Sequence, residues 1–535
     1  MQSLNFKVNN QHHSTTCHRG SSLLSLLRQL NYFGVHRVCE TGDCGACTVW
    51  VNDTAVHSCI YPAMRINKQS VTTIEGLSSN NELAPIQQAF LQAQGFQCGF
   101  CTPGMIMSAA KFPFSSVQDL YTNMKGNLCR CTGYQAIIES ILLFQNSNGR
   151  DTVATPAMLT PHSVGESVPK QDGTAIVTGK AYYTADNLQS GLLHLKILRS
   201  PIPHANIRRI NIDKAKALPG VVDIFTYKDV PRIPYTTAGH AEPVPDPLDH
   251  YLLDNKVRFV GDRVAAVVAS EVAIAQKALL LIEVDYEVLP YVINPVEAMT
   301  DECVVIHNEP ESVQIPVREA CAQRNRNRNI AGEIFLESGD VEKGFDEADL
   351  IVENTYTLPA VQHVHLEPHV TVTHLESDGT LVVRSSTQVP FHCQRLLSQL
   401  FDIPKEKIRV YKPQLGGGFG NKQEILTEDL CALATLRTGK PVQWEMTRNE
   451  EFTATNSRHA MTIKLKTGVK TDGKIVAQDL EIIANTGAYG NHGKTVVFLS
   501  GYIPLGLYRC DNKRFSAYAV YTNTMPGGAF RGYGA

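Results

Sequence analysis

Four cysteines in the first quarter of the chain have a spacing that is typical of iron-sulfur proteins. Cys39, Cys44 and Cys47 form the pattern C-x4-C-x2-C, and Cys59 follows further along the chain. This is the plant-type spacing for a 2Fe-2S cluster, in which each iron takes two thiolates. Structural zinc is the alternative, but zinc sites usually pair two short C-x2-4-C knuckles. The first set therefore favours an iron-sulfur cluster over zinc.

A second set of four cysteines follows as two close pairs. Cys98 and Cys101 form one pair, and Cys129 and Cys131 form the other. Each pair stands immediately before a predicted helix, so the positive ends of two helix dipoles would face one anionic cluster. Zinc is again the alternative, and the neighbouring plant-type set favours a second 2Fe-2S cluster. Two adjacent one-electron carriers would form a redox relay.

Two later segments also carry residues with possible chemistry. The glycine-rich run GGGFG at residues 416–420 follows a predicted strand, and its backbone N–H groups could approach an oxyanion. Taken alone it favours a tight turn, because it lacks both the P-loop lysine and the dinucleotide-binding spacing. In VQHVHLEP, His363, His365 and Glu367 alternate, so on a strand they would share one face. A metal triad and simple packing or pocket lining are the alternatives there.

The periodicity of apolar residues predicts the elements that must position the cysteines. A leucine-rich helix begins near Leu23, among several strand-like segments, and this order predicts a β-grasp fold like that of plant ferredoxins over residues 1–76. Four apolar helical stripes then predict a four-helix unit over residues 77–146. The strand-like segments are residues 3–9, 48–51, 55–59 and 71–74.

The remainder of the chain divides into a linker and two mixed domains. Residues 147–172 are polar and rich in proline, which predicts a linker. Residues 173–300 combine strands with a helix after Ser270, which predicts an α+β domain, and mixed elements continue over residues 320–535. The alternating Arg-Asn run at residues 324–329 favours a solvated loop over a basic binding patch. The strands expected before residue 300 are residues 192–198, 221–226, 264–269 and 283–289.

Composition and charge limit the possible partners. The 535 residues carry 49 Lys and Arg against 52 Asp and Glu, and this balance gives no electrostatic case for nucleic acid or an anionic membrane. The sequence lacks a charged leader with an apolar stretch, and it has no apolar run of the ~18 residues that a membrane span requires. We expect a cytoplasmic protein with a small-molecule or protein partner.

Several segments together resemble one enzyme family. CETGDCGACTVW, QCGFCTPGM and NLCRCTGY are similar to the iron-sulfur half of the molybdenum hydroxylases, the xanthine dehydrogenase and aldehyde oxidase family. The resemblance continues through GKAYYTAD, VDYEVLP, SSTQ, GGGFGNKQ and GAFRGYGA, and so covers nearly the whole chain.

The resemblance implies an α+β multidomain fold class and a set of cofactors. The domains implied are a ferredoxin-like 2Fe-2S domain, a helical 2Fe-2S domain, an α/β hammerhead domain over residues 173–300, and the first part of a molybdopterin-binding domain over residues 320–535. The cofactors implied are two 2Fe-2S clusters and a molybdenum-molybdopterin. The family places a structural Glu-Pro at Glu367 and holds molybdenum through the pterin, which favours packing or pocket lining for the two histidines.

The resemblance also assigns residues to the molybdenum site. It places Gly418, Phe419 and Gly420 against the metal, with Gln388 and Arg531 near the same centre. An amide and a guanidinium both donate hydrogen bonds to metal-bound oxygen without ligating the metal. In the helical domain, Gln97 beside Cys98 matches a glutamine near the pterin.

Three departures from the family pattern bear on substrate and electron acceptor. Gln423 stands where the xanthine-oxidising enzymes have a glutamate, and residues 496–503 lack their substrate-binding arginine. A neutral amide suits a differently oriented purine, another N-heterocycle or an aldehyde. The sequence between Gly133 and the molybdenum half leaves no room for the family's flavin domain. Electrons would then leave to a separate flavoprotein or another acceptor.

The resemblance implies an oxidoreductase that hydroxylates an electron-poor carbon and sends two electrons singly through the clusters. The cluster ligated through Cys131 would lie nearer the pterin, and the ferredoxin-like cluster would be the outlet. The general-base glutamate and most pterin contacts are expected on a polypeptide that carries the C-terminal part of the molybdopterin domain. We therefore expect activity only with that partner subunit. The alternative function is an electron-transfer iron-sulfur protein or a truncated, inactive member of the family.

Overall fold

The computed structural model describes residues 2–79, 82–112, 116–146, 164–165, 168–186, 189–239, 246–309 and 328–534. Most of the predicted linker and residues 324–327 of the Arg-Asn run lie outside the described residues. The chain forms two compact units. The first unit comprises Met1–Leu188, Val364–Pro368 and Pro413–Gly417. The second unit comprises Gln189–His363, His369–Lys412 and Gly418–Ala535.

The first unit begins with the expected β-grasp domain. Its sheet has the order β2-β1-β5-β3-β4, with β1 parallel to β5 and the other pairs antiparallel. The leucines of α1 are buried against this sheet, and Ser22 caps the helix by accepting from the Ser25 N–H. The elements are β1 Gln2–Val8, β2 Gln11–Cys17, α1 Leu23–Gln29, β3 Thr48–Val51, β4 Thr54–His57, η1 Ala63–Ile66, β5 Ser70–Thr72 and η2 Ile74–Gly76.

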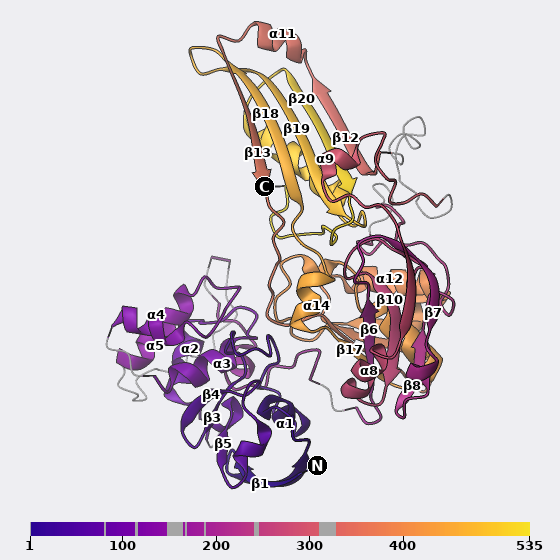
Figure 1. The fold of residues 1–535 in the computed structure, drawn as a ribbon. Helices are drawn as coiled ribbons and strands as arrows, with labels where there is room; N and C mark the ends of the chain where they lie inside the picture. Colours follow the sequence, from indigo (N-terminus) through magenta and orange to yellow (C-terminus); the bar gives the residue numbers. More distant parts are fainter. Residues whose placement is uncertain are drawn as a thin grey trace. The chain divides into compact units, whose positions relative to one another are not determined.

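The four-helix expectation is also confirmed. Pro85 stands at the start of α2, where its missing N–H is no loss, and Ser116 caps α4. Helices α2 to α5 lie together in Figure 1, and an apolar cluster of buried residues from these helices includes Cys101 and Cys129. The helices are α2 Pro85–Gln92, α3 Thr102–Ala109, α4 Val117–Met124 and α5 Gln135–Asn146, followed by α6 Gly173–Val177.

The second unit contains a seven-stranded sheet built from distant parts of the chain. Its order is β16-β15-β14-β17-β6-β10-β8, and β17 pairs in parallel with β6, Val442 opposite Leu193. A separate sheet has the order β11-β7-β9. The elements before residue 300 are β6 Leu193–Arg199, β7 Ala205–Asn211, α7 Asp213–Lys216, β8 Val221–Phe225, β9 Lys256–Val257, β10 Arg263–Ala269, α8 Val272–Leu279, β11 Glu283–Val288 and α9 Pro295–Ala298.

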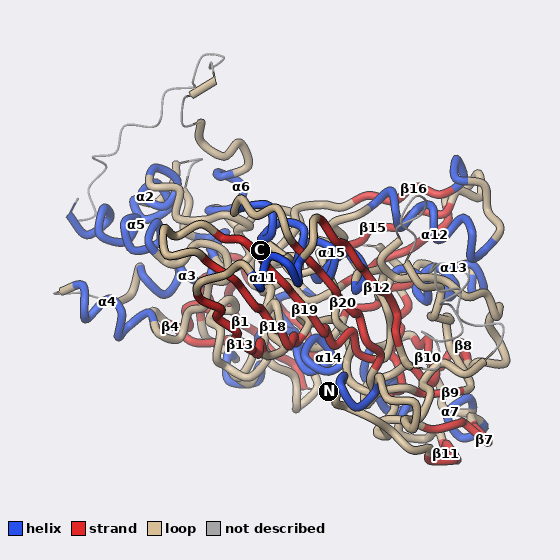
Figure 2. The backbone as a smooth tube through the Cα atoms, turned by 90° about the horizontal axis from the view of Figure 1, so that it is seen from above, coloured by secondary structure: helices blue, strands red, loops and turns tan. Residues whose placement is uncertain are grey.

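A five-stranded sheet with the order β12-β20-β19-β18-β13 completes the second unit (Figures 1 and 2). Helix α15 packs against β12, β19 and β20. The remaining elements are β12 Ile330–Ser338, α11 Val341–Asp346, β13 Leu350–Leu358, β14 Val370–Leu375, β15 Leu381–Ser385, α12 Pro390–Phe401, η3 Lys405–Lys407, β16 Ile408–Tyr411, η4 Asn421–Gln423, α13 Glu428–Thr438, β17 Val442–Glu445, α14 Arg448–Thr453, β18 Ala460–Val469, β19 Ile475–Gly487, α15 Gly493–Leu507 and β20 Lys513–Tyr521. Among the described helices, none combines the length and apolar character needed to cross a membrane.

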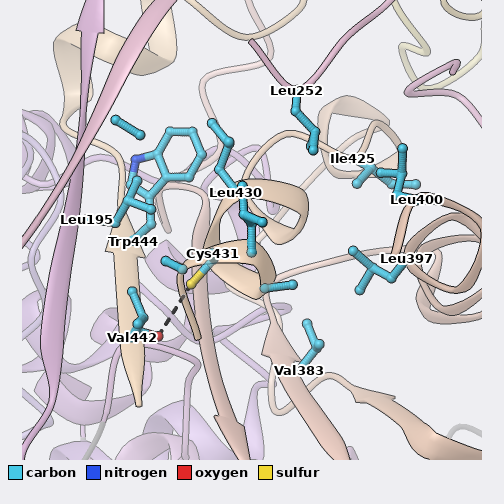
Figure 3. Close-up of a cluster of buried hydrophobic side chains, with 14 of the residues drawn as sticks. Leu195, Leu252, Val383, Leu397, Leu400, Ile425, Leu430, Cys431, Val442 and Trp444 are labelled. Carbon is cyan, nitrogen blue, oxygen red and sulfur yellow. Dashed lines mark hydrogen bonds between the residues drawn. The ribbon is translucent and has the colours of Figure 1, made fainter. Parts of the chain in front are cut away.

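The largest buried cluster joins the strands on both sides of the β17–β6 pairing. Figure 3 shows Trp444 of β17 and Leu195 of β6 near Leu430 and Cys431 of α13. The Cys431 thiol donates a hydrogen bond of 3.3 Å to the Val442 carbonyl. The strands before residue 300 and the strands after residue 369 therefore share one core.

Leu430 is fully buried in this core, so Leu430→Ala should lower the free energy of unfolding by about 2–5 kcal/mol. The measurement is urea unfolding followed by Trp444 fluorescence in a Trp50→Phe background. Leu280→Ala is the control, because Leu280 is 86% exposed. Equal midpoints for the two alanine variants would contradict a shared core around Leu430.

Candidate functional site

The structure brings the first four cysteines together. The Cys44 and Cys59 thiols donate hydrogen bonds to Cys39 and keep its pKa far below the usual range. Cys59 also interacts with Cys47, and the Thr41 N–H donates to the Cys39 sulfur at 3.5 Å. Such a cluster of four thiols is the donor set that a 2Fe-2S cluster requires.

The second four cysteines also converge. The sulfur atoms of Cys98 and Cys131 are 3.4 Å apart, and hydrogen bonds from Cys101 and then Cys131 lower the pKa of Cys129 to about 2. Cys101 directly precedes α3, and Cys131 lies shortly before α5, as the sequence predicted. This donor set also suits a 2Fe-2S cluster, whose negative charge two helix N-termini would stabilise.

The loop of the second set contacts buried polar groups. The carbonyl of Cys98 accepts hydrogen bonds from the Tyr183 hydroxyl at 2.9 Å and the Gln414 side-chain amide at 3.3 Å. His36 stacks on Phe100 with ring centroids 4.3 Å apart and donates from Nδ1 to the Phe100 carbonyl at 2.6 Å. Burial lowers the pKa of His36 to about 3, so this ring is neutral near pH 7.

The glycine-rich loop is strained, and Gln388 contacts it. Phe419 has φ 54° and Gly420 has φ 108°, both in the left-handed region. The Gly420 N–H donates to Gln388 Oε1 at 3.0 Å, and a Cβ atom at Gly418 would lie only 2.5 Å from the same oxygen. The Arg531 N–H donates to the Phe419 carbonyl at 2.7 Å. Because the loop uses the Gln388 oxygen, the NH2 end of this amide is the one suited to donate to a ligand oxygen.

The other predicted site residues fall in two places. Gln423 ends η4 next to this loop and is half-buried, with its N–H donating to the Gly420 carbonyl at 2.9 Å. Arg531 is exposed, although its backbone contacts the loop. Gln97 is exposed beside Cys98 in the first unit. The second unit thus gathers every residue expected at the molybdenum except Gln97.

His363, His365 and Glu367 do not lie on a strand, so the arrangement in which they would share one face does not occur. Residues 362–368 form no strand, because Val364 has φ 55°, a conformation that a β-branched residue rarely adopts. His363 Nε2 donates to the Ala529 carbonyl at 2.8 Å, and His365 Nδ1 donates to the Glu367 carbonyl at 2.6 Å. Both histidines thus bond to backbone carbonyls, which is the packing role favoured from the sequence.

A buried ion pair that the sequence did not predict lies next to Gln423. His492 Nδ1 is 2.5 Å from Glu424 Oε1, and the Thr237 hydroxyl donates to Glu424 Oε2 at 2.8 Å. Burial opposes both charges, but each partner favours the other's charged form, so the pKa of Glu424 is lowered and the pKa of His492 is raised. Sixty-eight positions separate the two residues, so no local pattern could have paired them.

The same network reaches the segment that precedes Arg531. The Asn491 side chain donates to Asn456 Oδ1 at 3.0 Å and to the Gly527 carbonyl at 3.3 Å. A Cβ atom at Gly528 would lie 3.0 Å from Glu424 Oε1. One buried network therefore positions both the loop of Gln423 and the segment that leads to Arg531.

The ion pair should make stability depend on pH in both directions. The contribution of Glu424 is present above the ordinary carboxyl pKa of 4.5 and is lost as pH falls through its lowered folded value. The contribution of His492 is present below the ordinary imidazole pKa of 6.5 and is lost as pH rises through its raised folded value. The pair therefore stabilises the fold most between these two ordinary values.

Glu424→Gln should accordingly lower the free energy of unfolding by roughly 3–5 kcal/mol near pH 5.5, because it leaves a buried imidazole without its anion. Thermal unfolding at about pH 5.5 and about pH 9 measures this loss, which should be smaller at the higher pH. Glu337→Gln, an exposed position on β12, is the control. A loss that is the same at both pH values would exclude an ion pair.

Four family models match successive parts of the chain. They are a 2Fe-2S iron-sulfur cluster binding domain over residues 6–73, a 2Fe-2S binding domain over residues 73–142, the aldehyde oxidase and xanthine dehydrogenase a/b hammerhead domain over residues 178–290, and a molybdopterin cofactor-binding domain over residues 322–535. The chain thus carries two 2Fe-2S domains and a molybdopterin cofactor-binding domain, in the order that the resemblance implied.

Two relatives cover different shares of the chain. An Escherichia coli protein named probable hypoxanthine oxidase is 35% identical over 563 residues, which cover 99% of this chain and 58% of that protein. The nicotinate dehydrogenase large molybdopterin subunit of Eubacterium barkeri is 32% identical over 372 residues, which cover 69% of this chain and 82% of that subunit. The chain therefore spans little more than half the length of the first of these relatives.

The fold of this chain matches part of a solved enzyme, and the match covers the whole of this chain. The aldehyde oxidoreductase from Desulfovibrio gigas aligns with a TM-score of 0.88 and 28% identity, covering 100% of this chain and 59% of that one. The expected α+β multidomain fold class is thereby confirmed. With its two 2Fe-2S domains, its hammerhead domain and its molybdopterin cofactor-binding domain, the chain belongs to the molybdenum hydroxylase family of xanthine dehydrogenases and aldehyde oxidases.

Proposed function

We propose that the protein is part of an oxidoreductase that hydroxylates a purine-like N-heterocycle or an aldehyde and passes the electrons through two 2Fe-2S clusters. The observation that carries this proposal is the gathering of two four-thiol sets in one compact unit. The proposed ligands are Cys39, Cys44, Cys47 and Cys59 for one cluster and Cys98, Cys101, Cys129 and Cys131 for the other. Relatives named hypoxanthine oxidase and aldehyde oxidoreductase support the two substrate classes.

When bound, the molybdenum-molybdopterin supplies the two-electron oxidation of the substrate carbon. The residues of this chain position that group and the substrate. The Gln388 side chain, whose oxygen accepts from the Gly420 N–H, would donate through its NH2 group to an oxygen of the centre, and the loop of Phe419 would contribute its backbone. Gln97 and Arg531 are further proposed cofactor contacts. None of these side chains has a proton that is labile near pH 7, so their proposed role is binding and orientation.

Gln423 is the proposed substrate-facing residue. It lies on the same short loop as Gly420, is half-buried and carries no charge. Its amide can donate one hydrogen bond and accept another, which matches the neighbouring N–H and C=O groups of a neutral heterocycle. The adjacent Glu424–His492 pair fixes the backbone at this position.

Further polypeptide is proposed to complete the site. The alignment covers only 58% of the first relative, and several relatives are named as subunits. We propose that the remaining pterin contacts and a general-base glutamate come from a polypeptide resembling the C-terminal part of the molybdopterin domain, on the same chain or on a partner. A separate flavoprotein or other acceptor would take the electrons. None of the described cysteines is in a disulfide, which suits the reducing cytoplasm.

Two 2Fe-2S clusters correspond to about four irons per chain. Cys44→Ser should remove about two irons and one of two electron paramagnetic resonance signals from the reduced protein. Cys17→Ser, a buried cysteine of the same domain outside both sets, should retain both signals. Loss of both signals in Cys44→Ser would contradict two separate clusters. Iron without molybdenum in the assembled complex would instead favour the electron-transfer function.

Gln423→Glu should change the substrate preference of the molybdenum-containing complex. A carboxylate cannot donate the amide hydrogen bond, and its charge alters the binding of the transition state. We expect the ratio of kcat/KM for a purine to kcat/KM for an aldehyde to change by about tenfold, equivalent to ~1.4 kcal/mol. Gln118→Glu on the exposed face of α4 is the matched control. An unchanged ratio would show that Gln423 does not face the substrate.

A further inference from the structure

A buried carboxylate lies in the same compact unit as the second four-cysteine set. Glu367 is 1% exposed and belongs to the segment Val364–Pro368, which packs with the first unit although it comes from the molybdopterin domain. Its neighbour Leu366 is a member of the buried cluster that contains Cys101 and Cys129.

Short contacts connect Glu367 to the loop that carries these cysteines. Glu367 Oε2 accepts a hydrogen bond of 2.8 Å from the Gly416 N–H. A Cβ atom at Gly416 would lie only 2.6 Å from Phe100 Cδ2, so the backbone here is in close contact with that ring. Phe100 stands between Cys98 and Cys101 in the sequence, and Gln414 donates to the Cys98 carbonyl.

Three other titratable groups of this region, Asp186, His36 and Tyr183, are either paired or neutral. Asp186 is buried but forms an ion pair with Arg28, with Nη2 2.9 Å from Oδ1. His36 is neutral because burial lowers its pKa to about 3. Tyr183 is neutral because burial, and then the charge of nearby Cys98, raises its pKa. The Glu367 carboxylate also opposes ionisation of both the Tyr183 hydroxyl and the Cys98 thiol.

We infer that Glu367 lowers the reduction potential of the cluster held by Cys98, Cys101, Cys129 and Cys131 relative to the cluster of the first set. The inference rests on the proposed function, which assigns a cluster to each set. Reduction adds one negative charge to a cluster, and a buried carboxylate nearby disfavours that charge far more than an exposed one would. The molybdopterin domain would thus tune an iron-sulfur centre through one inserted side chain.

The expected consequence is that electron transfer from the second-set cluster to the first-set cluster is favoured over the reverse transfer. One electron leaves the reduced second-set cluster and enters the oxidised first-set cluster, which leaves the second oxidised and the first reduced. Lowering the potential of the donor makes this exchange more favourable. Glu367 would then be a positioning residue that acts through charge, without contact with substrate.

Glu367→Gln tests the inference, because the amide oxygen can still accept from Gly416 while the charge is removed. Redox titration of the full protein, followed by electron paramagnetic resonance, gives the potential of each cluster separately. We expect the reduction equilibrium of the second-set cluster to become about tenfold more favourable, equal to 59 mV for one electron. The first-set cluster is the internal control, and Glu139→Gln on the exposed side of α5 is the surface control.

Two more variants separate charge from structure. Glu367→Asp keeps the charge and should leave the potential close to that of the unmodified protein, whereas Glu367→Ser is a second neutral replacement that should reproduce the shift of Glu367→Gln. The inference would be overturned if the neutral variants kept both cluster signals with unchanged reduction potentials. It would also be overturned if the potentials of both clusters shifted equally. Absence of the second signal from the unmodified protein would instead overturn the proposed function.

Discussion

The first unit must hold four cysteine sulfur atoms close together in each of two sets, although thiolates repel one another. The rest of the unit depends on this constraint. Each set brings four sulfur atoms together, so positive groups nearby stabilise the thiolates. The second set has such groups because Cys101 and Cys131 precede helices, whose N-termini are positive. In the second unit, the buried Glu424–His492 pair lies directly after the loop of Phe419 and Gln423, where Phe419 has a left-handed backbone.

Local sequence patterns predicted much of this structure. The cysteine spacing, the apolar stripes of α2 to α5 and the strands β6, β8, β10 and β11 were expected, because each depends on neighbouring residues, whereas β7 and β9 were missed. Strand β2 was missed because QHHSTTC is polar and has no apolar alternation. The alternation at His363 and His365 was compatible with a strand, but Val364 takes a left-handed conformation, which no propensity predicts.

Long-range features of the candidate site lay beyond sequence reasoning. The parallel pairing of β17 with β6 joins residues far apart in the chain. The register of these two strands depends on how their side chains pack in the folded core, which local sequence does not reveal. Glu424 stands directly beside the residue singled out for substrate choice, but nothing in its neighbourhood identified His492 as its partner. Motifs located the predicted ligands and loops, whereas the groups that fix them became visible only in three dimensions.

The segments Val364–Pro368 and Pro413–Gly417 have a consequence for biosynthesis. The hydrogen bond between Gln414 and Cys98 joins residues 316 positions apart, so the iron-sulfur unit cannot be completed until both late segments have left the ribosome. At roughly 5–20 residues per second, that delay after Cys131 is on the order of tens of seconds. The second cysteine loop thus spends this interval without its final packing, a period in which an assembly factor could reach the thiols.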